Sequence, residues 1–79
     1  GEVVFEGIEW RLAKELLNSD TDELHITHQE LAIKLGSARE VISRNLKQFE
    51  AKGLVKLNRG TVTIIDREEL IKLTSIEEK

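Results

Sequence analysis

The chain of 79 residues contains no cysteine and no proline, and only three of its residues are aromatic. The absence of cysteine excludes a disulfide framework and thiolate-based metal or redox chemistry. No apolar run approaches the roughly 20 residues that a membrane-spanning helix needs, and the first residues lack the basic and apolar regions of a signal peptide. These absences predict a cytoplasmic domain without membrane contact. The length allows one such domain and is too short for two.

Charge is unevenly distributed, although the net charge is only −3. Residues 1–24 carry seven acidic and two basic residues, residues 25–65 carry seven basic and three acidic residues, and residues 66–79 carry five acidic and three basic residues. A basic centre between acidic flanks can form one positive face, which matters more for binding a polyanion than the total charge does. The alternative is that these blocks only solvate the surface.

The spacing of apolar residues predicts three helices in the first two thirds of the chain. The first runs from Ile8 to about Asn18 and carries Trp10 as a core or interface anchor. The second begins with a capping box formed by Thr27 and Glu30 and ends at Gly36, which can adopt the left-handed conformation. The third runs from about Ala38 to Lys52 and stops at Gly53.

The last third predicts a small β wing and a closing helix. Two short alternating segments, 55–57 and 61–65, flank the turn residues 58–60 and are typical of a hairpin. Asp66 caps a final helix, which gives way to a polar tail from Thr74. Residues 3–5 are too few to define a strand. The prediction is one mainly α domain with a small β wing, a winged helix-turn-helix over residues 1–79, ordered from about 7 to 74.

The third helix carries different kinds of side chain on its two sides. A rotation of about 100° per residue assigns each position to one side or the other. One side, predicted to pack on the second helix, comprises Ala38, Val41, Ile42, Asn45, Leu46 and Phe49. The other side comprises Arg39, Glu40, Ser43, Arg44 and Lys47. Arginine and glutamate side chains read guanine and cytosine edges in the major groove, and a helix-turn-helix presents such residues near the start of its second helix. The segment therefore predicts sequence-specific binding of double-stranded DNA.

The ordered set of motifs resembles the DNA-binding domain of Crp/Fnr-family bacterial transcription regulators. The resemblance covers most of the chain: Arg11-Leu12-Ala13 and Leu16-Leu17 in the opening helix, residues 26–32 in the first motif helix, Leu35-Gly36, Arg39-Glu40 and Ser43-Arg44 in the turn and recognition helix, and Lys52-Gly53-Leu54-Val55, Gly60 and Thr63-Ile64 around the wing. No single triplet is specific to the family, whereas the order of these motifs across some fifty residues is.

The resemblance implies roles for individual residues. Base contacts are implied for Arg39, Glu40 and Arg44, with Ser43 as a further contact near the bases, and a half-site with the family's G-A core. Arg39 together with Ser43 combines features of the Crp-like and Fnr-like branches, so the branch stays open. Phosphate contacts are implied for Thr27, His28, Gln29 and, in the wing, Arg59; Lys47 is added to them from its position on the exposed side.

One local departure concerns the residue before the Arg-Glu pair. The family usually has Ser or Thr there, which caps the helix and contacts phosphate, whereas this chain has Ala38. Ser37, one residue earlier, can take over both roles. Glu40 would then complete a second capping box and be drawn away from DNA.

The resemblance also implies partners that this chain cannot supply by itself. Full-length members have an upstream effector-sensing and dimerisation domain, which is absent from this sequence; the chain begins without Met and is expected to be part of a longer protein. The expected partners are a two-fold symmetric DNA site, a second copy in a homodimer, and RNA polymerase. No cofactor is expected in this domain.

Other functional classes fit the residues less well. A winged helix used only for protein–protein contact would suit the acidic flanks, but it should present an apolar third helix. RNA readers of single strands use stacking aromatic residues, which are missing here. His25 and His28 with Glu30 are a poor zinc set because no further Cys or His completes it. No Gly-rich phosphate loop or nucleophile–base set indicates an enzyme.

Overall fold

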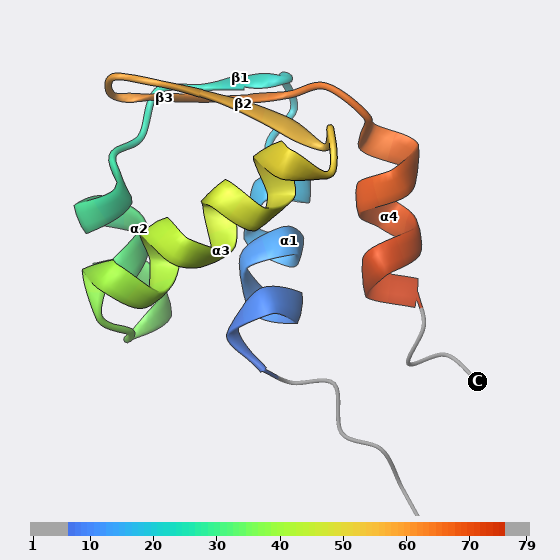
Figure 1. The fold of residues 1–79 in the computed structure, drawn as a ribbon. Coiled ribbons are helices and arrows are strands. Elements are labelled where there is room, and N and C mark those ends of the chain that lie inside the picture. The colour runs from blue at the N-terminus through green and yellow to red at the C-terminus, as the bar shows by residue number, and fades with distance from the viewer. Residues whose placement is uncertain (1–6, 76–79) are drawn as a thin grey trace, which may run out of the picture.

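The computed structural model describes residues 7–75 and confirms a mainly α winged helix-turn-helix (Figure 1). Residues 3–5, which are too few to define a strand from the sequence, lie outside the described residues. No described helix is both long and apolar enough to cross a membrane. The elements follow one another as α1 (Ile8–Leu17), β1 (Glu23–Leu24), α2 (His28–Leu35), α3 (Arg39–Ala51), β2 (Val55–Asn58), β3 (Thr61–Ile64) and α4 (Arg67–Ser75).

Helix α2 begins and ends as its sequence predicts. The Thr27 hydroxyl accepts from the backbone N–H of Glu30 at 3.0 Å, and the Glu30 carboxylate accepts from the backbone N–H of Thr27 at 2.8 Å. This reciprocal capping box satisfies two N–H groups that have no partner within the helix. Gly36 has a φ of 67°, a left-handed conformation that lets the chain leave α2 and start α3 after a short turn.

The predicted cap of α3 is wrong. Ala38 occupies the N-cap position and makes no side-chain cap bond, while its carbonyl accepts from the N–H of Ile42 at 3.2 Å. Ser37 lies one residue too early because its own N–H closes the end of α2, donating to the Ala32 carbonyl at 2.9 Å. Ala38 is also exposed, so its predicted place on the buried side of the third helix is wrong. The second capping box therefore does not form, and Glu40 stays exposed.

The wing is a three-stranded antiparallel sheet in the order β1-β3-β2, which corrects the prediction of a two-stranded wing. The missed strand β1 pairs Glu23 with Thr63 and Leu24 with Val62. Two residues are too few to show a period of two, so only the pairing with β3 reveals this strand. Asn58, predicted to lie in the turn, is instead the last residue of β2 and pairs with Thr61. The turn therefore has two residues, and Gly60 in it has a φ of 70°.

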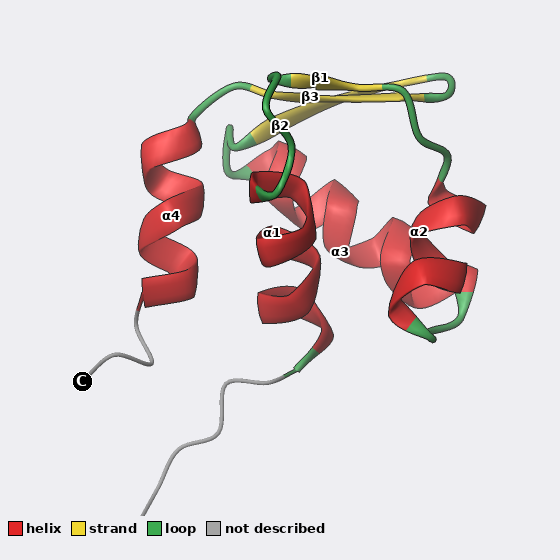
Figure 2. Cartoon of the chain, turned by 180° about the vertical axis from the view of Figure 1, so that it is seen from behind, coloured by secondary structure: helices red, strands yellow, loops and turns green. Residues whose placement is uncertain are grey.

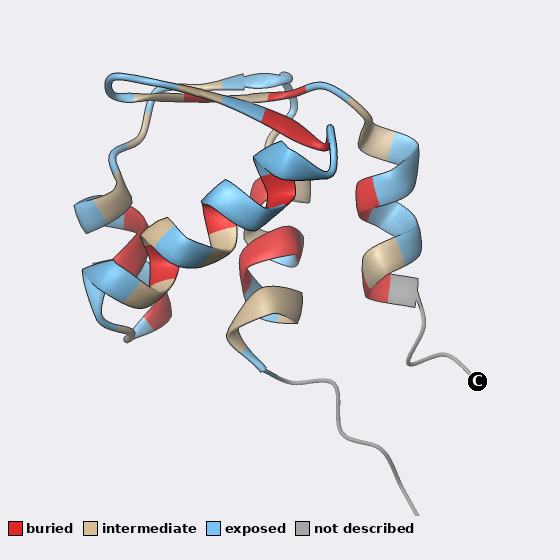
Figure 3. Cartoon of the chain, in the orientation of Figure 1, coloured by how far each residue is buried: buried red, intermediate tan, exposed pale blue. Residues whose placement is uncertain are grey.

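The core lies where α1, α2 and α3 meet beneath the sheet (Figures 1 and 3). Its central side chains, Leu12, Leu16, Leu31, Ile42, Leu46, Phe49 and Leu70, are fully buried. In two opposite views the tip of the β2–β3 hairpin and α2 lie on one side of the molecule and α4 lies on the other (Figures 1 and 2). The packing thus leaves the outer surfaces of α2, α3 and the hairpin tip on a common side, away from α4.

Helix α4 closes the opposite side of the fold. Asp66 caps it as predicted, accepting from the Glu69 N–H at 3.2 Å. The helix continues through Thr74, which is only 8% exposed, so the predicted start of a polar tail at Thr74 is wrong, while residues 76–79 lie outside the described residues. Thr74 is held because its carbonyl accepts from the indole N–H of Trp10 at 3.0 Å. Trp10 thereby joins α1 to α4, in keeping with the anchoring role that its sequence position predicts.

Candidate nucleic-acid interface

The outward side of α3 is polar along its length. Arg39, Glu40, Arg44 and Lys47 are exposed, and Ser43 between them is half-buried. The opposite side buries Ile42, Leu46 and Phe49 in the core, which fixes the orientation of the helix. An α-helix with its side chains is about as wide as the major groove of B-DNA. The outward side of α3, defined by these five polar residues, is here called the α3 face.

A shallow concavity lies between the start of α2, the middle of α3 and the tip of the wing, with a volume of about 510 Å³. It brings together five of the predicted phosphate contacts with one predicted base contact. The lining residues are Thr27, His28, Gln29, Arg39, Lys47, Glu50, Leu57, Asn58, Arg59 and Gly60. Glu40, Ser43 and Arg44 lie on α3 outside this lining, and Ser37 lies in the turn before α3.

His28 and Ser43 are joined by a hydrogen bond that the sequence did not predict. The Nδ1 atom of His28 lies 2.7 Å from the Ser43 hydroxyl oxygen, which links the first residue of α2 to the α3 face. Burial lowers the pKa of His28 below its ordinary value, and the positive charges of Arg39 and Lys47 lower it further. The neutral imidazole is therefore favoured in the free protein.

Glu50 is a residue of the concavity that sequence reasoning missed. Its carboxylate accepts from the backbone N–H of Leu57 at 3.0 Å and so ties the outer edge of β2 to α3. This bond positions the wing, including Arg59 at its tip, relative to the α3 face. Arg11 was also missed: its guanidinium donates to the Leu35 carbonyl at 2.9 Å and holds the end of α2. No local pattern predicts either bond, because each joins the residue to a partner elsewhere in the chain.

The basic residues differ in whether they have an acidic partner. Lys34, Lys52, Arg67 and Lys72 form ion pairs with Glu15, Glu9, Asp22 and Glu69, respectively. In the described part of the chain, Arg39, Arg44, Lys47 and Arg59 form no ion pair with any acidic side chain. Arg11, Lys14 and Lys56 also lack an acidic partner among the described residues and lie on α1 and β2, whereas the first four cations lie on the α3 face and at the wing tip. Such a cluster attracts an anionic partner.

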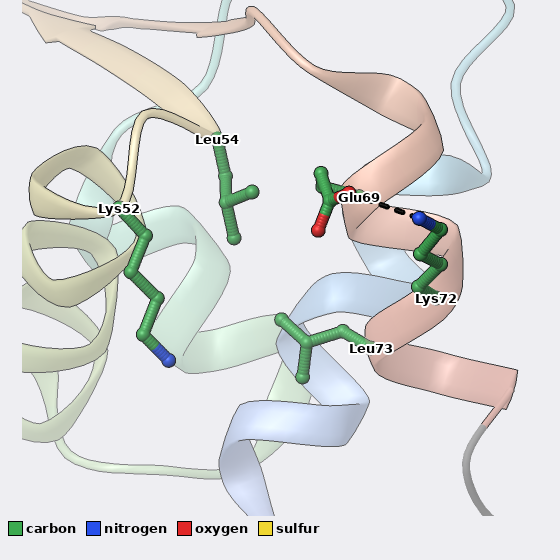
Figure 4. Close-up of a pocket in the computed structure, with 5 residues that line it drawn as sticks. All are labelled: Lys52, Leu54, Glu69, Lys72 and Leu73. Atoms are coloured by element: carbon green, nitrogen blue, oxygen red, sulfur yellow. Dashed lines mark hydrogen bonds and ion pairs between the residues drawn. The ribbon is translucent and has the colours of Figure 1, made fainter.

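A second hollow lies on the other side of the end of α3, against α4 (Figure 4). Leu54 and Leu73 point into it, Lys52 lies at one side, and Lys72 donates to Glu69 at 3.1 Å. Its lining contains none of the predicted contact residues. Among residues 7–75 no group of three or more His, Cys, Asp or Glu side chains could hold a metal ion. The large exposed apolar side chains of this part of the chain, Ile33, Ile65 and Ile71, all lie outside α3.

Comparison with known proteins agrees with this geometry. Residues 10–73 match the family model described as a Crp-like helix-turn-helix domain. A curated relative, the CRP-like cAMP-activated global transcriptional regulator of Mycobacterium tuberculosis strain H37Rv, is 28% identical over 82 residues, covering 90% of this chain and 37% of the relative.

Two solved structures are similar in both fold and sequence. A transcriptional regulator assigned to the Crp/Fnr family from Eubacterium rectale is 43% identical, with a TM-score of 0.80, and the match covers 90% of this chain and 35% of that one. The catabolite activator protein of Thermus thermophilus is 30% identical, with a TM-score of 0.72, and the match covers 87% of this chain and 32% of that one. The chain thus spans about a third of the length of these relatives.

Proposed function

Because the chain belongs to the family of Crp-like helix-turn-helix domains, as the DNA-binding domain of a Crp/Fnr transcription regulator, we propose that it reads one half-site of double-stranded DNA by placing α3 in the major groove. Arg39 and Arg44 donate to guanine, and Glu40 accepts from a cytosine amino group. Ser43 makes a further contact close to the bases. The expected half-site contains the G-A core of the family.

The observation that carries this proposal is the set of exposed, unpaired charges on the α3 face. Arg39 and Arg44 have no acidic partner among the described residues, and Glu40 is not held in a capping box. A side chain without a partner in the free protein loses no intramolecular ion pair when it turns toward a base. An apolar docking helix, the alternative function, would not present these residues.

The concavity beside α3 suits the sugar-phosphate backbone that borders the groove. Thr27, His28 and Gln29 lie at the start of α2, where the backbone N–H groups and the helix dipole favour an anion. Lys47 and Arg59 add positive charge from α3 and the wing. We assign Ser37, half-buried in the turn, the weakest phosphate contact, since it does not cap α3. These contacts position the domain and carry no sequence information directly.

A selection from random duplex DNA at low salt tests the base contacts. The wild-type chain should select a motif, and Arg44→Ala should flatten the preference at one guanine by about 1–3 kcal/mol. Lys34→Ala is the matched control, because it removes one positive charge that is paired with Glu15 away from the α3 face. It should select the wild-type motif. An Arg44→Ala motif identical to that of the wild type would contradict the assignment.

We also propose that two copies of the domain act together on a two-fold symmetric site, with dimerisation supplied by the remainder of the full-length protein. Half-sites about 10 bp apart match this symmetry. The isolated chain should bind one half-site weakly, and fusion to a dimeric coiled coil should raise affinity for paired half-sites by roughly 10²–10⁴ through effective concentration. Titration of both proteins on single and paired sites measures this, and tight binding of a lone half-site by a monomer would refute it. Contact with RNA polymerase stays a prediction.

A further inference from the structure

The hydrogen bond between His28 and Ser43 joins a predicted phosphate contact to a predicted base contact. The distance of 2.7 Å is at the short end for a bond between nitrogen and oxygen. Ser43 lies among the other predicted base contacts on α3, and His28 lines the concavity. In the described part of the chain no side chain bonds the other ring nitrogen of His28, Nε2. One imidazole is therefore positioned to bond a phosphate with Nε2 and Ser43 with Nδ1.

The protonation state of this ring decides what the Ser43 hydroxyl can do. A hydroxyl has one proton to donate and two lone pairs that can accept. When His28 is neutral with its proton on Nε2, Nδ1 accepts the Ser43 proton, and Ser43 offers only a lone pair to a base. When His28 is doubly protonated, Nδ1–H donates to Ser43, and the hydroxyl proton is free to be donated to a base.

A phosphate in the concavity would select between the two neutral forms of the ring. The hydrogen bond made by one ring nitrogen determines which tautomer is present. A phosphate oxygen can only accept, so it requires the proton on Nε2 and leaves Nδ1 as the acceptor for Ser43. Doubly protonated His28 can also donate from Nε2 to phosphate. Within the DNA complex, pH alone would then reverse the direction of the bond to Ser43.

The charges around His28 come from several elements and shift its titration in opposite directions. Arg39, Lys47 and Glu50 from α3 and Arg59 from the wing line the same concavity. On the side of α2, the Glu30 carboxylate is bonded to the Thr27 N–H. Burial, Arg39 and Lys47 lower the pKa of His28 in the free protein. A bound phosphate adds negative charge and raises that pKa again.

On the basis of the proposed function, we infer that His28 is a positioning residue which sets whether the Ser43 hydroxyl accepts or donates at a base edge, so that the preferred base at one position of the half-site changes with pH. Above the pH at which His28 takes up its second proton, Ser43 accepts and favours the amino group of adenine or cytosine. Below it, Ser43 donates and favours guanine or the O4 atom of thymine.

The experiment is a selection with the 79-residue chain at low salt, at about pH 5.5 and about pH 8, on either side of the ordinary histidine pKa of about 6.5. The preference at one position should shift by roughly three- to ten-fold between amino-bearing and carbonyl-bearing bases, the range expected for one hydrogen bond. Ser43→Ala should abolish the pH-dependent shift. His28→Asn, which keeps an amide near the Nδ1 position but cannot titrate, should give one preference at both pH values.

His25→Asn is the matched control, because His25 is exposed and lies outside the concavity. This variant should keep the pH-dependent preference of the wild type. Nitrogen NMR of the imidazole in the DNA complex supplies a readout that does not depend on any variant. It should find the proton of the neutral ring on Nε2.

The outcomes separate this inference from the proposed function. If the wild-type motif were the same at both pH values, or if pH changed only the overall affinity, His28 would not set base preference and the inference would be overturned, while the proposed function would stand. A neutral ring with its proton on Nδ1 in the complex would overturn it as well. If neither Arg44→Ala nor Ser43→Ala altered the motif, the proposed function itself would fail.

Discussion

The side of the molecule formed by α3, the start of α2 and the wing tip differs from the side formed by α1 and α4 in how its charges are paired. Every acidic residue that forms an ion pair in the described chain lies in α1, in the loop after it, or in α4. The cations of the α3 face and the wing tip have no such partner. The net charge of −3 hides this difference, because twelve of the fifteen acidic residues lie in residues 1–24 and 66–79.

A cluster of unpaired cations on one surface therefore indicates a polyanion site better than the total charge does. Exposed ion pairs contribute only about 0–1 kcal/mol to stability, so the pairs on the α1–α4 side are of little use as stability arguments. They matter because they neutralise cations that would otherwise compete for the ligand. The cations of the α3 face and the concavity, in contrast, stay available to attract an anionic partner.

The largest expected effect is on the stability of the domain, through the core that joins the two sides of the molecule. Phe49 is fully buried on α3 at the meeting point of the helices and the sheet. Phe49→Ala should lower the free energy of unfolding by about 3–5 kcal/mol, through lost burial and the cavity left behind. Urea denaturation measures this. Gln48→Ala, at the exposed neighbouring position, should change stability by no more than about 0.5 kcal/mol; a comparable loss there would contradict the assignment of the two sides of α3.

A smaller effect, confined to DNA binding, should separate unpaired from paired cations. Lys47→Ala and Arg59→Ala should each weaken binding about equally for all sequences and reduce the salt slope by roughly one unit. Lys34→Ala removes the same charge from a paired position and should leave the slope nearly unchanged. Affinities measured across a salt series provide the slopes. Equal slopes for all three variants would remove the distinction between the two sides.

The smallest expected effect concerns Thr27, where two substitutions should separate the stability of the domain from its affinity for DNA. Thr27 caps α2 and also lines the concavity. Thr27→Ala should cost about 1 kcal/mol of stability through the lost cap. Thr27→Asp should keep the cap and the stability but weaken DNA binding, because its negative charge faces the phosphates. Thermal unfolding and DNA titration of both variants test this. An unchanged DNA affinity of Thr27→Asp would mean that the DNA backbone does not lie beside this residue.

Local signals predicted most of the fold. The capping box of α2, the left-handed Gly36, the cap at Asp66 and, apart from Ala38, the two sides of α3 are set by hydrogen bonds and periodicities that span three or four residues, and these are confirmed. Two local predictions failed because a neighbouring element intervened. Ser37 closes α2 with its backbone N–H and so lies one residue before the N-cap position of α3, which Ala38 occupies; Thr74 is held in α4 by Trp10 from the other end of the chain.

The candidate site was predictable as a set of residues but not as an arrangement. The resemblance to Crp/Fnr regulators named the side chains that the structure places on the α3 face and around the concavity, and their contacts with DNA stay predictions. Glu50 could not be found this way, because its role depends on a bond to the free edge of β2. Nor could the bond between His28 and Ser43 be found, since it joins residues on two different helices.

The sequence by itself determined the helices, the caps of α2 and α4, the hairpin and the family to which the domain belongs, because these depend on interactions between near neighbours and on the order of motifs along the chain. Only the tertiary structure decided that β1 completes the sheet, that Glu50 holds the wing against α3, and which basic residues lack an acidic partner. These features depend on distances between residues far apart in sequence. Such distances are set only when the helices and the sheet pack around one common core.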